Sequence, residues 1–129
     1  MRRYRVVIYC PDQHLAYDLR TLDRQGVGGG VTGRIRLAHA LASLGHAVTA
    51  CVNCPDEASI GGVRYQHFSK LNQAEADVFI ASTSGAQDVS ALGGISIQAG
   101  LRLLMVHGAA FPRGAERQPF DFICAPSNF

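Results

Sequence analysis

An α/β fold built on a doubly wound parallel sheet is predicted by two features of this sequence. Short apolar runs rich in β-branched residues recur along the chain, and loops or helical segments separate them. One strongly helical pattern begins directly after a cluster of glycines. Because crossovers between parallel strands are right-handed, this alternation predicts a Rossmann-like, three-layer αβα arrangement with helices on both faces of the sheet.

About six strands are expected. The run 63–68 alternates apolar and polar residues, which is typical of a half-exposed edge strand. A doubly wound topology predicts the spatial order third, second, first, fourth, fifth and sixth strand. The six runs, in chain order, are 5–10, 47–52, 63–68, 77–82, 101–107 and 120–125.

The helical pattern spans 31–44, where Val31, Ile35 and Ala38 fall on one face. Gly45 supplies its stop signal. Residues 84–87 have capping-box spacing, which favours a helix start over a ligand contact. The segment 87–100 specifies no clear element, because two adjacent glycines interrupt any helix there.

Composition limits both the size and the class of the protein. With 129 residues, 47% of them hydrophobic, one domain spanning 1–129 is expected. The net charge is +2 and no dense basic block is present, which argues against nucleic acid as a partner. No apolar stretch approaches the ~18 residues of a membrane span, and the run after the N-terminal arginines is too short for a signal peptide. A cytoplasmic protein is therefore expected.

The four cysteines are Cys10, Cys51, Cys54 and Cys124. The CxxC spacing of Cys51 and Cys54 is compatible with a redox pair or half of a zinc site. The pair lacks a following helix start, and no second close pair completes a zinc site, so reduced structural thiols are favoured. No metal and no cofactor are expected.

Three interpretations of the glycine cluster Gly28, Gly29 and Gly30 remain open. The stretch 28–33 matches G-x-G-x-x-G, but it does not directly follow a strand, and the second strand is followed by Asn53 rather than a carboxylate. The cluster can also be a simple turn. The third interpretation is an anion cradle at a helix N-terminus. Arg34 favours the cradle, because an arginine near a helix start is disfavoured unless something negative compensates.

His107 follows the fifth predicted strand, where it would stand at the mouth of a cleft at the carboxyl ends of the strands. A backbone hydrogen bond in that turn is the competing interpretation. His14 and the first-loop residues Asp12, Asp18 and Asp23 are further candidates for the cleft. Neither a nucleophile elbow nor a P-loop is present.

Four stretches carry a resemblance to a known family. They are the glycine-led helix and the strand after it (28–50), the strand segments 76–81 and 103–107, and the residues 125–129. Together they resemble the N-terminal domain of a GT-B-type retaining glycosyltransferase. In that family a first helix ending in Leu-Gly-His-x-Val-Thr is frequent, as in residues 44–49 here.

The resemblance implies transfer of a sugar from a nucleotide-sugar donor to an acceptor, in a cleft between two Rossmann-like domains. The glycine loop would lie near the donor diphosphate and the acceptor, which maps onto Gly28, Gly29 and Gly30. The histidine that approaches the donor sugar maps onto His107. The nucleotide sugar is a substrate, so no cofactor is implied.

The second domain that the resemblance implies, with its acidic E-x7-E-type motif, has no counterpart in these residues. The chain is therefore expected to be the acceptor-side half of an enzyme and to lack turnover alone. The full enzyme would be cytoplasmic or peripheral at the inner face of the membrane. The rival hypothesis is a stand-alone nucleotide or dinucleotide binding module. An exposed inter-domain face would also favour a homo-oligomer.

Overall fold

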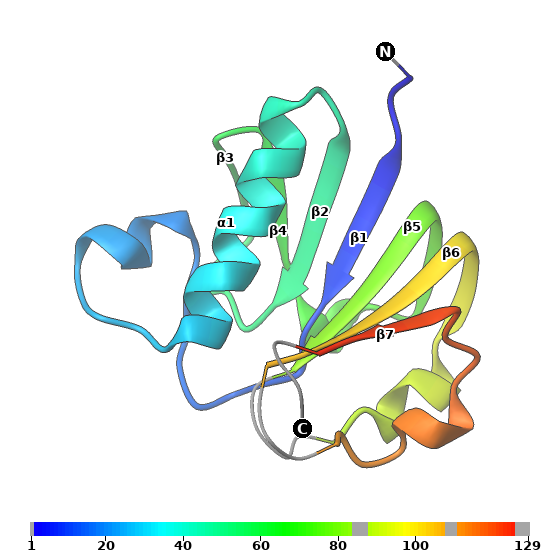
Figure 1. Cartoon of the computed structure of the whole chain (residues 1–129). Coiled ribbons are helices and arrows are strands. Elements are labelled where there is room, and N and C mark those ends of the chain that lie inside the picture. Colours follow the sequence, from blue (N-terminus) through cyan, green and yellow to red (C-terminus); the bar gives the residue numbers. More distant parts are fainter. Residues whose placement is uncertain (1, 84–87, 108–110, 126–129) are drawn as a thin grey trace.

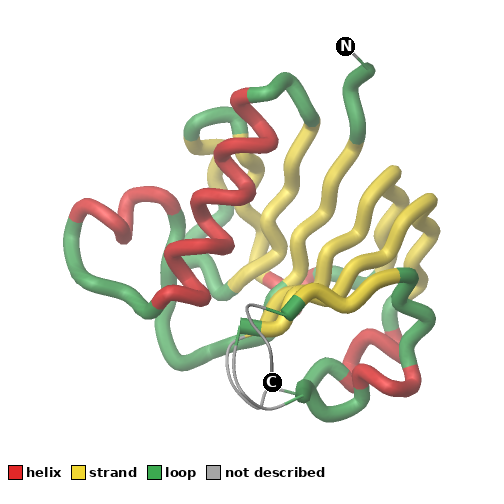
Figure 2. Tube along the Cα trace, in the orientation of Figure 1, coloured by secondary structure: helices red, strands yellow, loops and turns green. Residues whose placement is uncertain are grey.

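The structure, a computed structural model, describes residues 2–83, 88–107 and 111–125 of the chain. These residues form one seven-stranded sheet with the spatial order β3-β4-β2-β1-β5-β6-β7 (Figure 1). Figure 2 shows α1 as the one long helix beside the strands. The strands are β1 (Arg5–Tyr9), β2 (Ala47–Val52), β3 (Ala58–Ile60), β4 (Val63–His67), β5 (Gln73–Thr83), β6 (Ser96–Val106) and β7 (Phe122–Cys124). The helices are α1 (Gly29–Ser43) and the 3-10 helices η1 (Leu19–Asp23), η2 (Phe68–Lys70), η3 (Ser90–Gly94) and η4 (Ala115–Arg117).

The predicted strand order is confirmed, with one strand added. All neighbouring strands pair in parallel except β3 and β4, which form an antiparallel hairpin at the edge. The prediction that 63–68 forms an edge strand was therefore wrong, because β3 pairs with β4 and is itself the edge strand. β5 and β6 begin before the predicted starts, at Gln73 and Ser96. Their added residues alternate between exposed polar and more buried side chains, which is a strand pattern that the search for fully apolar runs passes over.

The two faces of the sheet are covered differently. On one face α1 packs on β2 and β4, and its residues Val31, Ile35 and Ala38 join Val6 and Ile8 in the first apolar core (Figure 1). On the other face the second core is closed mainly by η3, η4 and loops. The expectation of α-helices on both faces is not met in the described part of the chain. The described parts of the connections there, 88–95 and 111–121, contain 3-10 helices instead, and Gly93, Gly94 and Gly114 disfavour an α-helix.

α1 leaves part of its own face of the sheet uncovered. An apolar groove of about 330 Å³ runs between the helix and the strands β5 and β6. Its walls include Leu37 and Leu41 from α1, Ile80 from β5, and Leu103 and Met105 from β6. We therefore predict that the chain self-associates through an exposed apolar face. Solution scattering tests this prediction.

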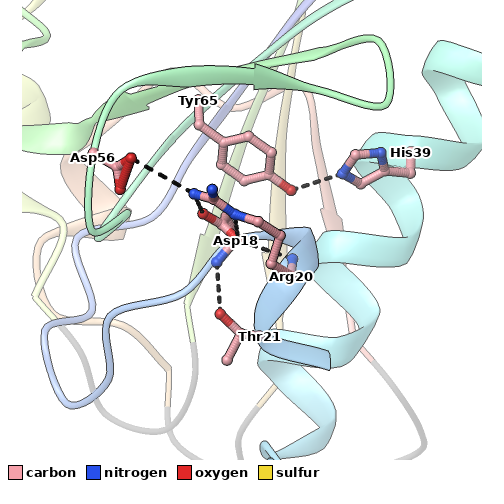
Figure 3. A network of polar contacts seen from close by, with 6 residues as sticks. All are labelled: Asp18, Arg20, Thr21, His39, Asp56 and Tyr65. Atoms are coloured by element: carbon pink, nitrogen blue, oxygen red, sulfur yellow. Dashed lines mark hydrogen bonds and ion pairs between the residues drawn. The ribbon is translucent and has the colours of Figure 1, made fainter. Parts of the chain in front are cut away.

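The long loop between β1 and α1 is anchored by a polar network (Figure 3). The buried Asp18 caps η1: its carboxylate accepts from the Arg20 backbone amide at 2.9 Å, and its own amide donates to the Thr21 hydroxyl at 3.0 Å. The Arg20 guanidinium also binds this carboxylate, at 2.7 Å, and lies 3.7 Å from Asp56. The hydrogen bonds from Arg20 hold the pKa of Asp18 below its usual value.

A histidine from α1 extends the same network to β4. His39 Nε2 lies 2.8 Å from the hydroxyl of the buried Tyr65 (Figure 3). The turn at Gly61 closes against this ring, because a Cβ at Gly61 would stand 3.1 Å from His39 Nδ1. Burial holds the pKa of His39 below 6.5, so the ring is neutral at physiological pH. The network thus fixes the loop that carries Asp12 and Tyr17 to the candidate site.

Candidate functional site

The candidate site lies at the carboxyl ends of β1, β5 and β6, where the first turn of α1 also begins (Figure 1). In open parallel sheets, ligands bind outside these ends, at the point where the strand order reverses. In this sheet the reversal falls between β1 and β5, since β2 lies on one side of β1 and β5 on the other. The side chains gathered there come from the first loop, α1, β5 and the residue after β6.

The glycine cluster forms the start of α1. Gly28 is the extended N-cap and the helix begins at Gly29, two residues before the predicted start. Gly28 has no side chain with which to cap this end. Gly28 and Gly29 are exposed, and a Cβ at either position would meet nothing within 4 Å. The first backbone amides of α1 are therefore held by no side-chain cap at an open, electropositive helix end.

Arg34 lies in the interior, with its side chain 2% exposed. Its Nε donates to the Ser82 hydroxyl at 3.0 Å and its Nη1 to the Tyr17 hydroxyl at 2.9 Å. Its Nη2 lies 3.9 Å from a carboxylate oxygen of the buried Asp12. An arginine near a helix start is unfavourable unless a negative group lies close to it, and the Asp12 carboxylate is that group here. The guanidinium thus ties α1 to the end of β5 and to the first loop, and the Asp12 carboxylate offsets its charge.

His107 follows directly after β6 and its backbone amide donates to the Thr83 carbonyl at 3.1 Å. Its ring lies against α1, since a Cβ at Gly33 would stand 3.8 Å from His107 Cε1. His107 Nε2 is buried and has no hydrogen-bond partner among the described residues. Burial, and then the charge of Arg34, hold the pKa of His107 below 6.5 against the opposing effect of Asp12. The imidazole is therefore neutral at physiological pH.

We expect the thermal melting midpoint to fall as the pH is lowered from about 7.5 to about 5. The folded-state pKa values of His39 and His107 lie below 6.5, so the unfolded chain takes up protons first. Their contribution to stability is complete above pH 6.5 and is lost as the pH falls toward the folded-state values. His39→Gln should flatten this dependence, whereas the same change at the exposed His14 should not. A midpoint that stays constant or rises on acidification would contradict the assignment.

The remaining candidates lie elsewhere or serve the fold. His14 and Asp23 are exposed, while Asp18 belongs to the loop anchor. The cysteines are free thiols. Burial raises the pKa of Cys10 to about 11 and that of Cys51 to about 12, which leaves both unreactive at neutral pH. The candidate helix start at 84–87 lies outside the described residues.

No group of three or more His, Cys, Asp and Glu side chains in the described part of the chain is placed to hold a metal ion. No helix among the same residues has the length and apolar character to cross a membrane.

The site also contains Tyr17, which sequence reasoning did not single out, and Ser82, which lies at a strand end where the predicted strand order places the cleft. Tyr17 is an aromatic residue within a polar loop, and such a residue needs a buried partner. Ser82 is a polar residue at the end of an apolar strand, which was a usable signal for the cleft. Their bonds to Arg34 depend on the tertiary approach of α1 and β5, which residue spacing does not encode.

Comparison with protein-family models, curated proteins and solved structures finds no match for this chain.

Proposed function

We propose that this chain is a doubly wound, Rossmann-like domain that holds the diphosphate of a nucleotide sugar at the start of α1. In this proposal it forms the acceptor-side half of a GT-B-type glycosyltransferase. The observation that carries it is the open, uncapped glycine start of α1 beside the imidazole of His107. The resemblance of residues 28–50 and 103–107 to that family points in the same direction.

The chemistry of the helix start supports a phosphate ligand. Amides without side chains in front of them allow close approach of an anion, and the helix dipole favours negative charge. The amides concerned belong to the first turn, after the N-cap Gly28, and include those of Gly29 and Gly30. During transfer they would stabilise the charge that grows on the leaving diphosphate.

His107 would orient the sugar. A neutral imidazole whose Nε2 has no partner among the described residues can form one hydrogen bond to a sugar hydroxyl once the groups that bury this nitrogen move aside. Holding the sugar ring in one orientation removes a large part of the activation free energy of group transfer. The nucleoside and the acidic motif would lie in a second Rossmann-like domain, so the isolated chain is expected to bind diphosphate weakly and to transfer nothing. In this proposal the acceptor is a hydroxyl-bearing sugar, lipid or polysaccharide at the cytoplasmic side of the cell.

Titration of the isolated chain with UDP and GDP, followed by amide NMR shifts, tests the proposal. We expect the largest shifts at Gly29, Gly30 and Val31, with a change at the His107 ring. Gly29→Val should weaken binding by at least about tenfold, because its side chain enters open space in front of the amides. Gly28→Asp should raise stability by a few tenths of a kcal/mol as an N-cap and yet weaken binding by charge repulsion.

Gly26→Val is the matched control, since Gly26 also faces open space but precedes the helix. It should bind both diphosphates as the unaltered chain does. Shifts with NAD that exceed those with UDP and GDP would favour the dinucleotide module instead. Equal binding by the Gly29 and Gly26 variants would refute the role of the helix start.

A further inference from the structure

The apolar groove beside α1 follows from the handedness of the crossovers. Right-handed connection puts the link from β1 to β2, which contains α1, on the face of the first core. The links from β5 to β6 and from β6 to β7 run in the opposite direction along the sheet, so they lie on the other face, where η3 and η4 close the second core. The described links therefore leave the α1 side of β5, β6 and β7 uncovered.

The uncovered side is apolar beyond the groove itself. Leu103 and Met105 of β6 line the groove. Phe122 and Cys124 of β7 pair in register with these two residues, and residues paired in register project to the same face of a sheet. Phe122 is 62% exposed, although burial of a phenylalanine ring is strongly favourable. An apolar strip thus runs from α1 across β6 to the edge strand β7.

The shape of the groove suits an α-helix. α1 stands one layer above the sheet, and Leu37 and Leu41, about one turn apart, form its wall of the groove. A second helix beside α1, at the roughly 8–10 Å separation of packed helices, rests on Ile80 and Met105. The volume of about 330 Å³ has room for the few apolar anchors that such a helix presents. The surface of a bilayer is flat, so α1 keeps it from the floor of the groove.

Two arginines stand at the end of the groove where the strands begin. Tyr4 lines this end, and the Arg2 guanidinium lies over its ring, 5.2 Å from the ring centroid. Arg2 and Arg3 are exposed, and neither forms an ion pair with an acidic side chain of the described residues. Arg5, by contrast, pairs with Glu75 at 3.5 Å. This end of the groove therefore favours a partner with negative charge.

The direction of α1 fixes where that charge lies in the partner. α1 runs antiparallel to β1, and His46, just after the helix, accepts a hydrogen bond from the Tyr4 amide at 3.1 Å (Figure 1). The C-terminal end of α1 is thus close to the two arginines. A helix that lies antiparallel to α1 begins at this end, and acidic side chains are favoured in the first turn of a helix.

We propose that an amphipathic α-helix of a partner protein, with acidic residues in its first turn, docks in this groove antiparallel to α1. Its apolar side chains, spaced i, i+3 or i+4 and i+7, contact Leu37, Leu41 and the floor of the groove. Its acidic first turn faces Arg2 and Arg3. The groove lies on a face of the sheet and not at the carboxyl ends of the strands, so this inference goes beyond the proposed function and does not depend on it.

Fluorescence anisotropy with labelled synthetic peptides tests the proposal. Two peptides of about four helical turns share one stripe of leucines, and the first turn carries glutamates in one and lysines in the other. We expect the acidic peptide to bind at least about tenfold more tightly than the basic peptide. A scrambled form of the acidic peptide, without the leucine stripe, should not bind. Equal affinities for the acidic and basic peptides would overturn the proposal.

Reversing the charge of the two arginines should reverse the preference. The double variant Arg2→Glu with Arg3→Glu is expected to bind the basic peptide more tightly than the acidic one. Both side chains are exposed, so the fold should remain intact. Arg24→Glu with Arg64→Glu is the matched control, because both of these arginines are exposed and neither lines the groove. If both double variants keep the preference of the unaltered chain, the charge assignment is wrong.

A second pair of variants tests the apolar contact. Leu41→Gln should weaken binding of the acidic peptide at least about tenfold, since Leu41 lines the groove. Ile123→Gln is the control: Ile123 is 55% exposed, but it pairs in register with Leu104 of the second core and so projects to the opposite face. Its affinity should stay within about twofold. Equal binding by the two variants would refute docking in the groove.

The same peptides decide between the possible occupants. The self-association predicted above uses this apolar face, so the acidic peptide should shift the chain toward the monomer in sedimentation velocity. A dimer that does not respond to the peptide assigns the groove to a second copy, and binding of anionic phospholipid vesicles without any binding of peptide assigns it to a membrane. Either result refutes the proposal. UDP titration of the same samples reports separately on the helix start.

Discussion

Replacing Arg34 with methionine is expected to lower the free energy of unfolding by about 3–5 kcal/mol, the range found when one partner of a buried ion pair is removed. The change takes away the guanidinium that lies beside Asp12 and binds the hydroxyls of Tyr17 and Ser82. Urea unfolding followed by circular dichroism measures the effect. The first loop and the end of β5 should lose protection from hydrogen exchange before the rest of the sheet does.

Arg36→Met is the matched control, because Arg36 is exposed on the same helix. Its effect should stay within about 0.5 kcal/mol. Adding Asp12→Asn to the Arg34 variant should recover part of the loss, since a neutral amide is less costly to bury than a carboxylate. Similar stabilities for the Arg34 and Arg36 variants would show that the buried pair contributes nothing to folding.

Gly114→Ala is the second change with a large expected effect, about 2–5 kcal/mol of lost stability. Gly114 has φ +85°, in the left-handed region, where an alanine costs about 1–2 kcal/mol. A Cβ there would also stand 2.8–2.9 Å from the Cβ, Cα and backbone nitrogen of Ser90. Backbone cannot rotate away as a side chain can, so η3 and η4 must separate, at a further cost of about 1–3 kcal/mol.

Gly45→Ala separates the two causes. Gly45 has φ +97°, but a Cβ there meets nothing within 4 Å, so only the backbone cost of about 1–2 kcal/mol applies. The difference between the two alanine variants measures the contact with Ser90. Thermal melts of both variants, followed by near-ultraviolet circular dichroism as a reporter of side-chain packing, measure this difference. A Gly114 variant no less stable than the Gly45 variant would refute the close packing of η3 and η4.

The strand order could be predicted because it depends on few facts. Apolar runs such as 5–10 and 101–107 identify buried strands, and right-handed crossovers restrict their order. The helices of the second face could not be predicted in the same way. The segments before β6 and β7 are short and rich in glycine, and 3-10 turns there owe their existence to packing against the sheet. β3 is a three-residue strand that pairs with β4 in a hairpin and is too short to stand out as an apolar run.

The site was predicted in position more than in detail. A histidine after a strand and glycines before a helix are local signals, and the structure brings His107 against the helix that Gly29 begins. Arg34 was expected to face a ligand, whereas its bonds run to protein side chains. Whether a long side chain on a helix points to the cleft or the interior depends on what the neighbouring strand offers, here Ser82. No local pattern carries that information.

The place of β1 in the sheet has a consequence for synthesis on the ribosome. β1 is made before both of its neighbours, β2 and β5, and β5 ends only at Thr83. One edge of β1 thus has no pairing partner until the chain has been translated as far as β5. During that interval a nascent apolar strand edge can join a foreign chain. Its protection by chaperones, rather than the final stability, would then set the yield of folded molecules.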